Sequence, residues 1–167
     1  SVSAGYQHSL LCNSAGQVLS FGCGQGGCLG HGDEEDHFFP KHILAVHSSG
    51  STLHGGGGSE ASPHFIQVSA GAVHSVMLST CGAVFTCGYG ANGKLGHGDE
   101  DNCLLPRRVL LLTGKQVAHV AAASDHTLAM TDGEETFAWG YGRDGCLGVT
   151  WPASQGTDFS KVPIALP

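Results

Sequence analysis

Apolar residues along this chain occur in short runs that glycine and small polar residues separate. Three of the runs, Val18–Phe21, Val84–Cys87 and Thr136–Trp139, are rich in β-branched or aromatic residues, and a Gly-rich segment follows each of them. Short runs of this kind between turn residues are typical of β-strands. No stretch keeps a 3.6-residue apolar period over several turns, so we expect few helices. The pattern predicts an all-β fold.

The runs recur in three units that share one internal order. Each unit opens on Val-x-Ala-Gly or Val-Ala-Ala-Ala, continues with a His-headed apolar run, and then has a turn and the third run. We expect a fourth strand after the proline of the first two units, over 41–46 and 107–112, since Pro40 and Pro106 lose no ladder donor at a strand start. Four short strands in about 50 residues predict the blade of a β-propeller.

Equivalent glycines give the spacing of the units. Gly22 and Gly88 are 66 residues apart, whereas Gly88 and Gly140 are 52 apart. The excess lies in a Gly- and Ser-rich stretch, whose composition predicts a flexible, solvated insertion. The predicted repeat units are approximately 1–46, 65–112 and 117–167, and the predicted insertion is 47–64.

The sequence Gly-x-Gly-x-x-Gly-x-Leu-Gly occurs once in each unit, beginning at Gly22, Gly88 and Gly140. A single copy suggests a dinucleotide-binding loop, which needs a following helix to bind the pyrophosphate. The first two copies are followed instead by His-Gly and then by acidic residues, which repel phosphate. We therefore interpret the motif as a turn within each repeat, and we expect no cofactor.

Together, Val-x-Ala-Gly-x-x-His-Ser-Leu, aromatic-Gly-x-Gly-x-x-Gly-x-Leu-Gly-His-Gly and Pro-x-x-Val resemble the RCC1 (regulator of chromosome condensation) repeat. The resemblance implies three four-stranded blades of what is a seven-bladed ring in that family. The remaining blades would come from the parent chain or from self-association of copies. The chain departs from the family pattern at Ala122–Ala123, where Ala-Gly is usual, and at Cys28, Lys94 and Cys146, where Gln is usual.

The resemblance implies a protein–protein interaction scaffold or regulatory module within a larger protein, and not an enzyme. The alternative that it leaves open is guanine-nucleotide exchange on a Ran-type small GTPase. The family includes members with different activities, so the fold alone does not decide between them. The chain contains no metalloprotease, nucleophile-elbow or P-loop motif.

The charge of the chain narrows the class of partner. The formal net charge is −7, from 14 acidic and 7 basic residues. Nucleic-acid binding needs clustered Lys and Arg, so we expect no direct nucleic-acid contact and a partner with a basic surface, such as a protein or a small GTPase. Half of the acids fall in two equivalent segments, and these are the candidate partner-binding residues: Asp33, Glu34, Glu35, Asp36, Asp99, Glu100 and Asp101. The alternative is that both segments are simply solvated loops.

The histidines and cysteines raise a further hypothesis, that of a metal or redox site. His8, His74 and His126 share one repeat position, where a repeated packing or hydrogen-bonding role is favoured over a metal site because equivalent blade positions lie far apart. The seven cysteines form no Cys-x-x-Cys pair and are odd in number, which favours a reducing, intracellular setting. We expect Cys87 to be buried and Cys28 and Cys146 to be partly exposed. The apolar run 109–112 is far too short to cross a membrane.

Overall fold

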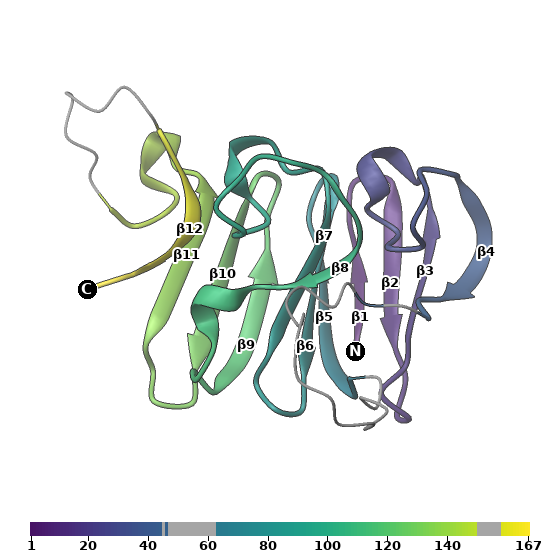
Figure 1. Cartoon of the computed structure of the whole chain (residues 1–167), viewed down its shortest axis with the longest axis horizontal. Coiled ribbons are helices and arrows are strands. Elements are labelled where there is room, and N and C mark those ends of the chain that lie inside the picture. Colours follow the sequence, from purple (N-terminus) through teal and green to yellow (C-terminus); the bar gives the residue numbers. More distant parts are fainter. Residues whose placement is uncertain (45, 47–62, 150–157) are drawn as a thin grey trace, which may run out of the picture.

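The computed structural model describes residues 1–44, 46, 63–149 and 158–167, and their strands form three four-stranded antiparallel sheets (Figure 1). Sheet I contains β1 (Val2–Ala4), β2 (His8–Cys12), β3 (Val18–Gly22) and β4 (His37–His42). Sheet II contains β5 (Phe65–Ala70), β6 (His74–Ser79), β7 (Val84–Gly88) and β8 (Cys103–Arg108). Sheet III contains β9 (Val117–Ala122), β10 (His126–Thr131), β11 (Thr136–Tyr141) and β12 (Phe159–Ala165). The predicted all-β fold is confirmed, whereas most of the predicted insertion 47–64 lies outside the described residues.

Strands in each sheet are neighbours in chain order, so every connection is local. Short hairpins join the second and third strands at one edge of the molecule (Figure 1). The opposite edge, here called the loop edge, carries the connections between third and fourth strands, with the 3₁₀ turns η1 (Gln25–Gly27), η2 (Ala91–Gly93) and η4 (Arg143–Gly145) (Figure 1). A further 3₁₀ turn, η3 (Leu110–Leu112), follows β8. Among the described residues, no helix is long and apolar enough to span a membrane.

The Gly-x-Gly-x-x-Gly motif forms the loop-edge turns, as expected. Its fifth residue is left-handed in all three copies, with φ of 67° at Gly26, 61° at Asn92 and 62° at Asp144. Glycine, asparagine and aspartate are the residues that tolerate this region best. The turn is a three-residue 3₁₀ element in each sheet rather than the start of a helix.

The predicted position of the fourth strand is wrong in both of the first two units. β4 and β8 begin before Pro40 and Pro106 and end at His42 and Arg108. Each proline lies where the pairing register with the third strand shifts, and such irregularities on an outer strand accommodate a residue without an N–H. The apolar stretch after Arg108 forms η3 and not the end of a strand.

Each sheet has two distinct faces, because side chains alternate along a strand and paired residues share a face. The His face carries His8, Leu10, Cys12, Val18 and Ser20 in sheet I, His74, Val76, Leu78, Val84 and Thr86 in sheet II, and His126, Leu128, Met130, Thr136 and Ala138 in sheet III. The Ser face carries Val2, Ala4, Ser9, Leu11, Leu19 and Phe21 in sheet I, Val68, Ala70, Ser75, Met77, Phe85 and Cys87 in sheet II, and Val120, Ala122, Thr127, Ala129, Phe137 and Trp139 in sheet III.

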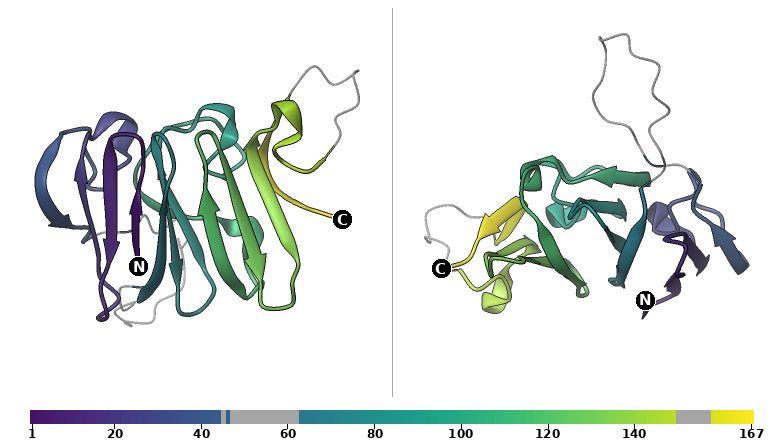
Figure 2. Two further views of the ribbon diagram at one scale, coloured as in Figure 1. Left: turned by 180° about the vertical axis from the view of Figure 1, so that it is seen from behind. Right: turned by 90° about the horizontal axis from the view of Figure 1, so that it is seen from below.

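The sheets stand side by side, and their facing sides form the two cores (Figure 2). The first core joins the His face of sheet I to the Ser face of sheet II, with Leu10 and Met77 both fully buried. The second joins the His face of sheet II to the Ser face of sheet III, with Val76 and Trp139 fully buried. The same contact between neighbouring sheets, here called a joint, therefore occurs twice: the first joint lies between sheets I and II and the second between sheets II and III. The joints set the positions of the loops at the loop edge.

Candidate interaction surface

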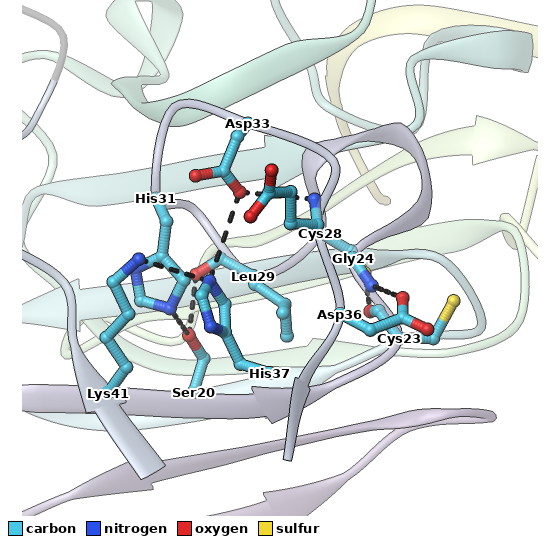
Figure 3. Close-up of polar contacts among 11 residues, drawn as sticks. Ser20, Cys23, Gly24, Cys28, Leu29, His31, Asp33, Asp36, His37 and Lys41 are labelled. Carbon is cyan, nitrogen blue, oxygen red and sulfur yellow. Dashed lines mark hydrogen bonds and ion pairs between the residues drawn. The ribbon is translucent and has the colours of Figure 1, made fainter. Parts of the chain in front are cut away.

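The loop after β3 is closed by a network of polar contacts around His31 (Figure 3). The Ser20 hydroxyl donates to the Leu29 carbonyl at 2.6 Å, so His31 Nε2 donates its hydrogen to Ser20 Oγ at 3.0 Å. The His31 ring lies edge-on to the His37 ring, with 4.8 Å between centroids. Burial, together with the nearby Lys41 ammonium, lowers the pKa of His31 to about 4. The ring is thus neutral and fixed at neutral pH.

Two of the candidate acids hold this loop in shape. The carboxylate of Asp36 accepts the backbone N–H of Gly24 at 2.9 Å, and that of Asp33 accepts the N–H of Glu35 at 3.2 Å (Figure 3). Gly24 packs so closely on the returning chain that an added Cβ would lie 2.1 Å from the Glu35 carbonyl oxygen. Asp33 and Asp36 therefore have a structural role in the loop.

The loop after β7 repeats the arrangement. His97 Nε2 contacts Thr86 Oγ1 at 2.9 Å, and Asn102, at the position of Asp36, accepts the N–H of Gly90 at 3.0 Å. The amide oxygen of Asn102 thus accepts the same backbone hydrogen bond that the carboxylate of Asp36 accepts in the first loop. This position therefore serves as a hydrogen-bond acceptor and needs no charge. The sequence already shows Asn102 at the position equivalent to Asp36, which indicates a role that needs no charge. Grouping the acids by charge alone missed this indication.

Two acids of the second loop are also bound within the chain. Asp99 accepts a hydrogen bond from Arg107 Nη1 at 3.3 Å, and Glu100 forms an ion pair with Lys161 of sheet III at 2.7 Å. The hydrogen bond from Lys161 lowers the pKa of the exposed Glu100. Glu100 thereby links the loop of sheet II to the outer strand of sheet III.

The remaining three candidates are different. Glu34, Glu35 and Asp101 are exposed, and within the described part of the chain their carboxylates have no hydrogen bond or ion pair. They lie in equivalent loops on the loop edge, next to carboxylates that hold those loops in place. The structure thus separates the seven acids into four with contacts inside the chain and three exposed ones without such a contact among the described residues.

The hydrogen-bonding role expected of the repeated histidines is confirmed at the two joints. His8 Nε2 contacts Ser75 Oγ at 2.9 Å, and Ser75 donates to the carbonyl of Cys28 at 2.7 Å. His74 Nε2 contacts Thr127 Oγ1 at 3.0 Å in the same way. The three histidines do not converge, and no cluster of three metal-ligating side chains is found among the described residues.

These buried histidines predict a loss of stability in weak acid. Burial lowers the pKa of His8 from 6.5 to about 4 and that of His74 to about 3. Below pH 6.5 the unfolded chain therefore binds protons that the folded chain does not, and the free energy of unfolding falls as the pH falls. We expect a decrease of up to about 1.4 kcal/mol per pH unit for each histidine, measured by urea unfolding at a series of pH values. The variant His8→Gln keeps a donor but cannot titrate, so its profile should be less steep, and parallel profiles would contradict this assignment.

The cysteines differ from expectation at one position. Cys87 is fully buried, as predicted, and Cys146 is exposed. Cys28 was expected to be partly exposed, but it is buried, and burial raises its pKa to about 12. The next sheet covers Cys28 at the first joint, which the repeat position alone did not reveal. All seven cysteines are free thiols.

Sequence reasoning also missed an ion pair between sheets II and III. The Lys94 side chain, only 2% exposed, reaches from the loop edge of sheet II to the carboxylate of Asp125 in sheet III, whose side chain is 41% exposed. Its ammonium also lies 5.3 Å from the centroid of the Tyr89 ring. Burial by itself would raise the pKa of Asp125, but the hydrogen bond and charge of Lys94 outweigh it, so that the pKa is lowered.

Comparison with known proteins agrees with this architecture. The sequence model described as "Regulator of chromosome condensation (RCC1) repeat" matches residues 15–78 and 81–130. The chain is 35% identical over 158 residues to the E3 ubiquitin-protein ligase HERC2 of Homo sapiens, covering 93% of the chain and 3% of HERC2. It is 33% identical over 150 residues to the ultraviolet-B receptor UVR8 of Arabidopsis thaliana, covering 89% of the chain and 31% of UVR8. The chain therefore spans less than a third of either relative.

Solved structures show the same fold. The crystal structure of human WBSCR16 superposes with a TM-score of 0.75 at 27% identity, over 99% of this chain and 38% of that one. Prp20p of Saccharomyces cerevisiae, whose structure was described with its binding properties to Gsp1p and histones, superposes with a TM-score of 0.77 at 23% identity, over 100% of this chain and 38% of Prp20p.

Proposed function

Since this chain belongs to the RCC1 repeat family, we propose that it serves as a protein-interaction module whose loop edge binds a basic protein surface through Glu34, Glu35 and Asp101. The relatives are named for different activities, one as a ubiquitin-protein ligase and another as an ultraviolet-B receptor, and the chain covers only a part of each. A fold shared by such different proteins supports a role in recognition more than a single chemistry.

The observation that carries the proposal is the division of the acids at the loop edge. Carboxylates that have no partner inside the described chain lie on loops that other carboxylates and Gly24 hold in shape. A preorganised loop loses little conformational freedom on binding, which favours affinity. Exposed like charges at one edge attract a partner of opposite charge and speed its association.

Two further aspects belong to the proposal. Histones, which are named with the neighbour Prp20p, are basic proteins and illustrate the chemistry that would fit this edge. The seven free thiols support action inside the cell, where thiols stay reduced. Nucleotide exchange on a Ran-type GTPase stays a prediction, which the release of labelled GDP would test.

A charge-reversal experiment tests the proposed edge. The double variant Glu34→Lys, Asp101→Lys should bind immobilised core histones, used as the basic probe, at least about tenfold more weakly than the original chain, with a smaller salt dependence. The matched control is Asp132→Lys, Glu134→Lys, which changes the net charge equally but lies in the hairpin at the opposite edge. The control should retain binding. Equal losses in both variants would show that overall charge acts and would overturn the proposed edge.

A further inference from the structure

Two leucines of the middle sheet are exposed although both neighbouring sheets are in place. They belong to η3, where Leu110 is 52% exposed and Leu111 is 63% exposed. Both faces of sheet II take part in a core, and η3 itself contacts β12 of sheet III. The exposure of these two side chains therefore does not come from an uncovered sheet face.

The conformation of η3 holds the two leucines outward. Residues three positions apart lie on the same side of a 3₁₀ turn. Val109 and Leu112, which are 1% and 3% exposed, both pack in the second core, and the N–H of Leu112 donates to the carbonyl of Val109 at 3.2 Å. The leucines between them are thus presented on a turn that is fixed at both ends, so a partner that binds them loses little to loop ordering.

A shallow hollow of about 40 Å³ lies beside the exposed leucines. Its lining consists of Leu110 and Leu111, the arginines at positions 107 and 108, and the loop residues Gly96 and His97. Apolar and cationic side chains therefore meet at one place next to the outer strand of sheet II. Arg108, Leu110 and Leu111 are here called the rim patch.

Arg108 brings an unpaired positive charge to the rim patch. Arg107 forms an ion pair with Asp99 at 3.3 Å, whereas Arg108 has neither a hydrogen bond nor a carboxylate partner within the described chain. The hydrogen bond with Ser79 lowers the pKa of the exposed Cys81 thiol, and the charge of Arg108 adds to this effect. The chain has twice as many acids as bases, yet this half-buried guanidinium is without one. Such a group can donate two parallel hydrogen bonds to a carboxylate.

We propose that the rim patch binds a short acidic segment of a partner protein, with an apolar side chain against the two leucines and a carboxylate on Arg108. The leucines alone would accept any apolar surface, and Arg108 restricts the choice to a negatively charged one. Apolar residues with arginine beside them are typical of protein interfaces. The net charge of −7 does not oppose this contact, because exposed charges are screened beyond about 8 Å at physiological ionic strength.

The rim patch is independent of the proposed binding of a basic partner at the loop edge. The two surfaces share no residue and select partners of opposite charge. Failure of either proposal would therefore leave the other in place.

Fluorescence anisotropy with the labelled peptide Glu-Leu-Leu-Glu-Glu-Leu as the probe tests the rim patch. The chain should bind this peptide, and matched peptides with Gln for every Glu, or with Ser for every Leu, should bind at least about tenfold more weakly. In the chain, Arg108→Gln and the double variant Leu110→Ser, Leu111→Ser should each weaken binding of the original peptide at least about tenfold. Circular dichroism checks that each variant folds.

Two control variants separate the rim patch from general effects. Leu44 is 86% exposed at the equivalent position of sheet I, since Ile43 and Val109, the residues before Leu44 and Leu110, donate equivalent hydrogen bonds to the third strand. Leu44→Ser therefore removes a matched leucine, and Arg143→Gln removes an exposed positive charge from sheet III. Both controls should bind the peptide as the original chain does, and equal losses in the controls would overturn the proposal.

Three other results would also overturn it. The first is the absence of saturable binding of the peptide, and the second is unchanged binding in Arg108→Gln, because the patch would then recognise apolar groups alone. The third is a different occupant. Binding of anionic lipid vesicles but not of the peptide would assign the patch to a membrane, and self-association that the double leucine variant abolishes, seen by sedimentation velocity, would assign it to a second copy.

Discussion

Replacing Gly93 with alanine should destabilise the protein by about 2–5 kcal/mol, through backbone strain together with overpacking. Gly93 has a φ of +69°, and an added Cβ would lie 2.3 Å from Lys161 Cα in sheet III. Because that atom belongs to the backbone, a side-chain rotation cannot relieve the contact, and sheet III must move away from sheet II. Thermal unfolding should show a decrease in Tm of roughly 10 °C for a chain of this size.

Gly145 provides the matched control for this substitution. It occupies the same position of the repeat with a φ of +79°, but nothing lies within 4 Å of the added Cβ. Gly145→Ala should therefore cost only the backbone strain, about 1–2 kcal/mol. The difference between the two variants measures the sheet-to-sheet contact alone. Equal losses would mean that the turn conformation, and not the joint, sets the need for glycine.

Removing the carboxylate of Asp125 should have a comparable effect. Asp125→Ala leaves the ammonium of Lys94 buried without its ion-pair partner, and such uncompensated charges cost about 3 kcal/mol or more. The lysine is held in place, since Thr127 Oγ1 donates to its carbonyl oxygen at 2.9 Å. Urea unfolding at neutral pH should show a lower midpoint with little change in slope.

The reverse substitution separates the charge from the packing. Lys94→Met keeps an apolar stem of similar length and leaves Asp125, whose side chain is 41% exposed, in contact with water. We expect it to cost about 1 kcal/mol, and the double variant Lys94→Met, Asp125→Ala to be close to Lys94→Met alone. Additive losses in the double variant would show that the two residues act independently and would contradict a coupled pair.

The repeat made most of the fold predictable from sequence. Three copies of one pattern fixed the number of sheets, the positions of the first three strands and the role of the Gly-rich turn, since each inference could be checked against two other copies. The fourth strand was misplaced because Pro40 was assigned to a strand start. Outer strands also admit proline at a register shift, and only the pairing with β3 shows that shift.

The candidate site was predictable only in outline. Charge and spacing located the acidic segments on equivalent loops, but they could not separate Asp36, which accepts a backbone N–H, from Glu34, which does not bind within the described chain. The Lys94–Asp125 ion pair joins residues that are 31 positions apart and belong to different sheets, so no local sequence pattern predicts it. Contacts across a joint depend on which sheet follows, and the repeat pattern does not carry that information.

Sheet II is buried on both faces, so it contributes to the stability of both joints. Its His and Ser faces both belong to a core, whereas sheets I and III each have one face in a core of the described chain. In such a linear array, each unit is stabilised mainly by its nearest neighbours. Sheet I or sheet III can open while one joint persists, but opening sheet II breaks both. The same amino-acid change at equivalent positions should therefore change the free energy of unfolding by different amounts in different sheets. The effect depends on which sheet holds the residue as well as on its position within the repeat.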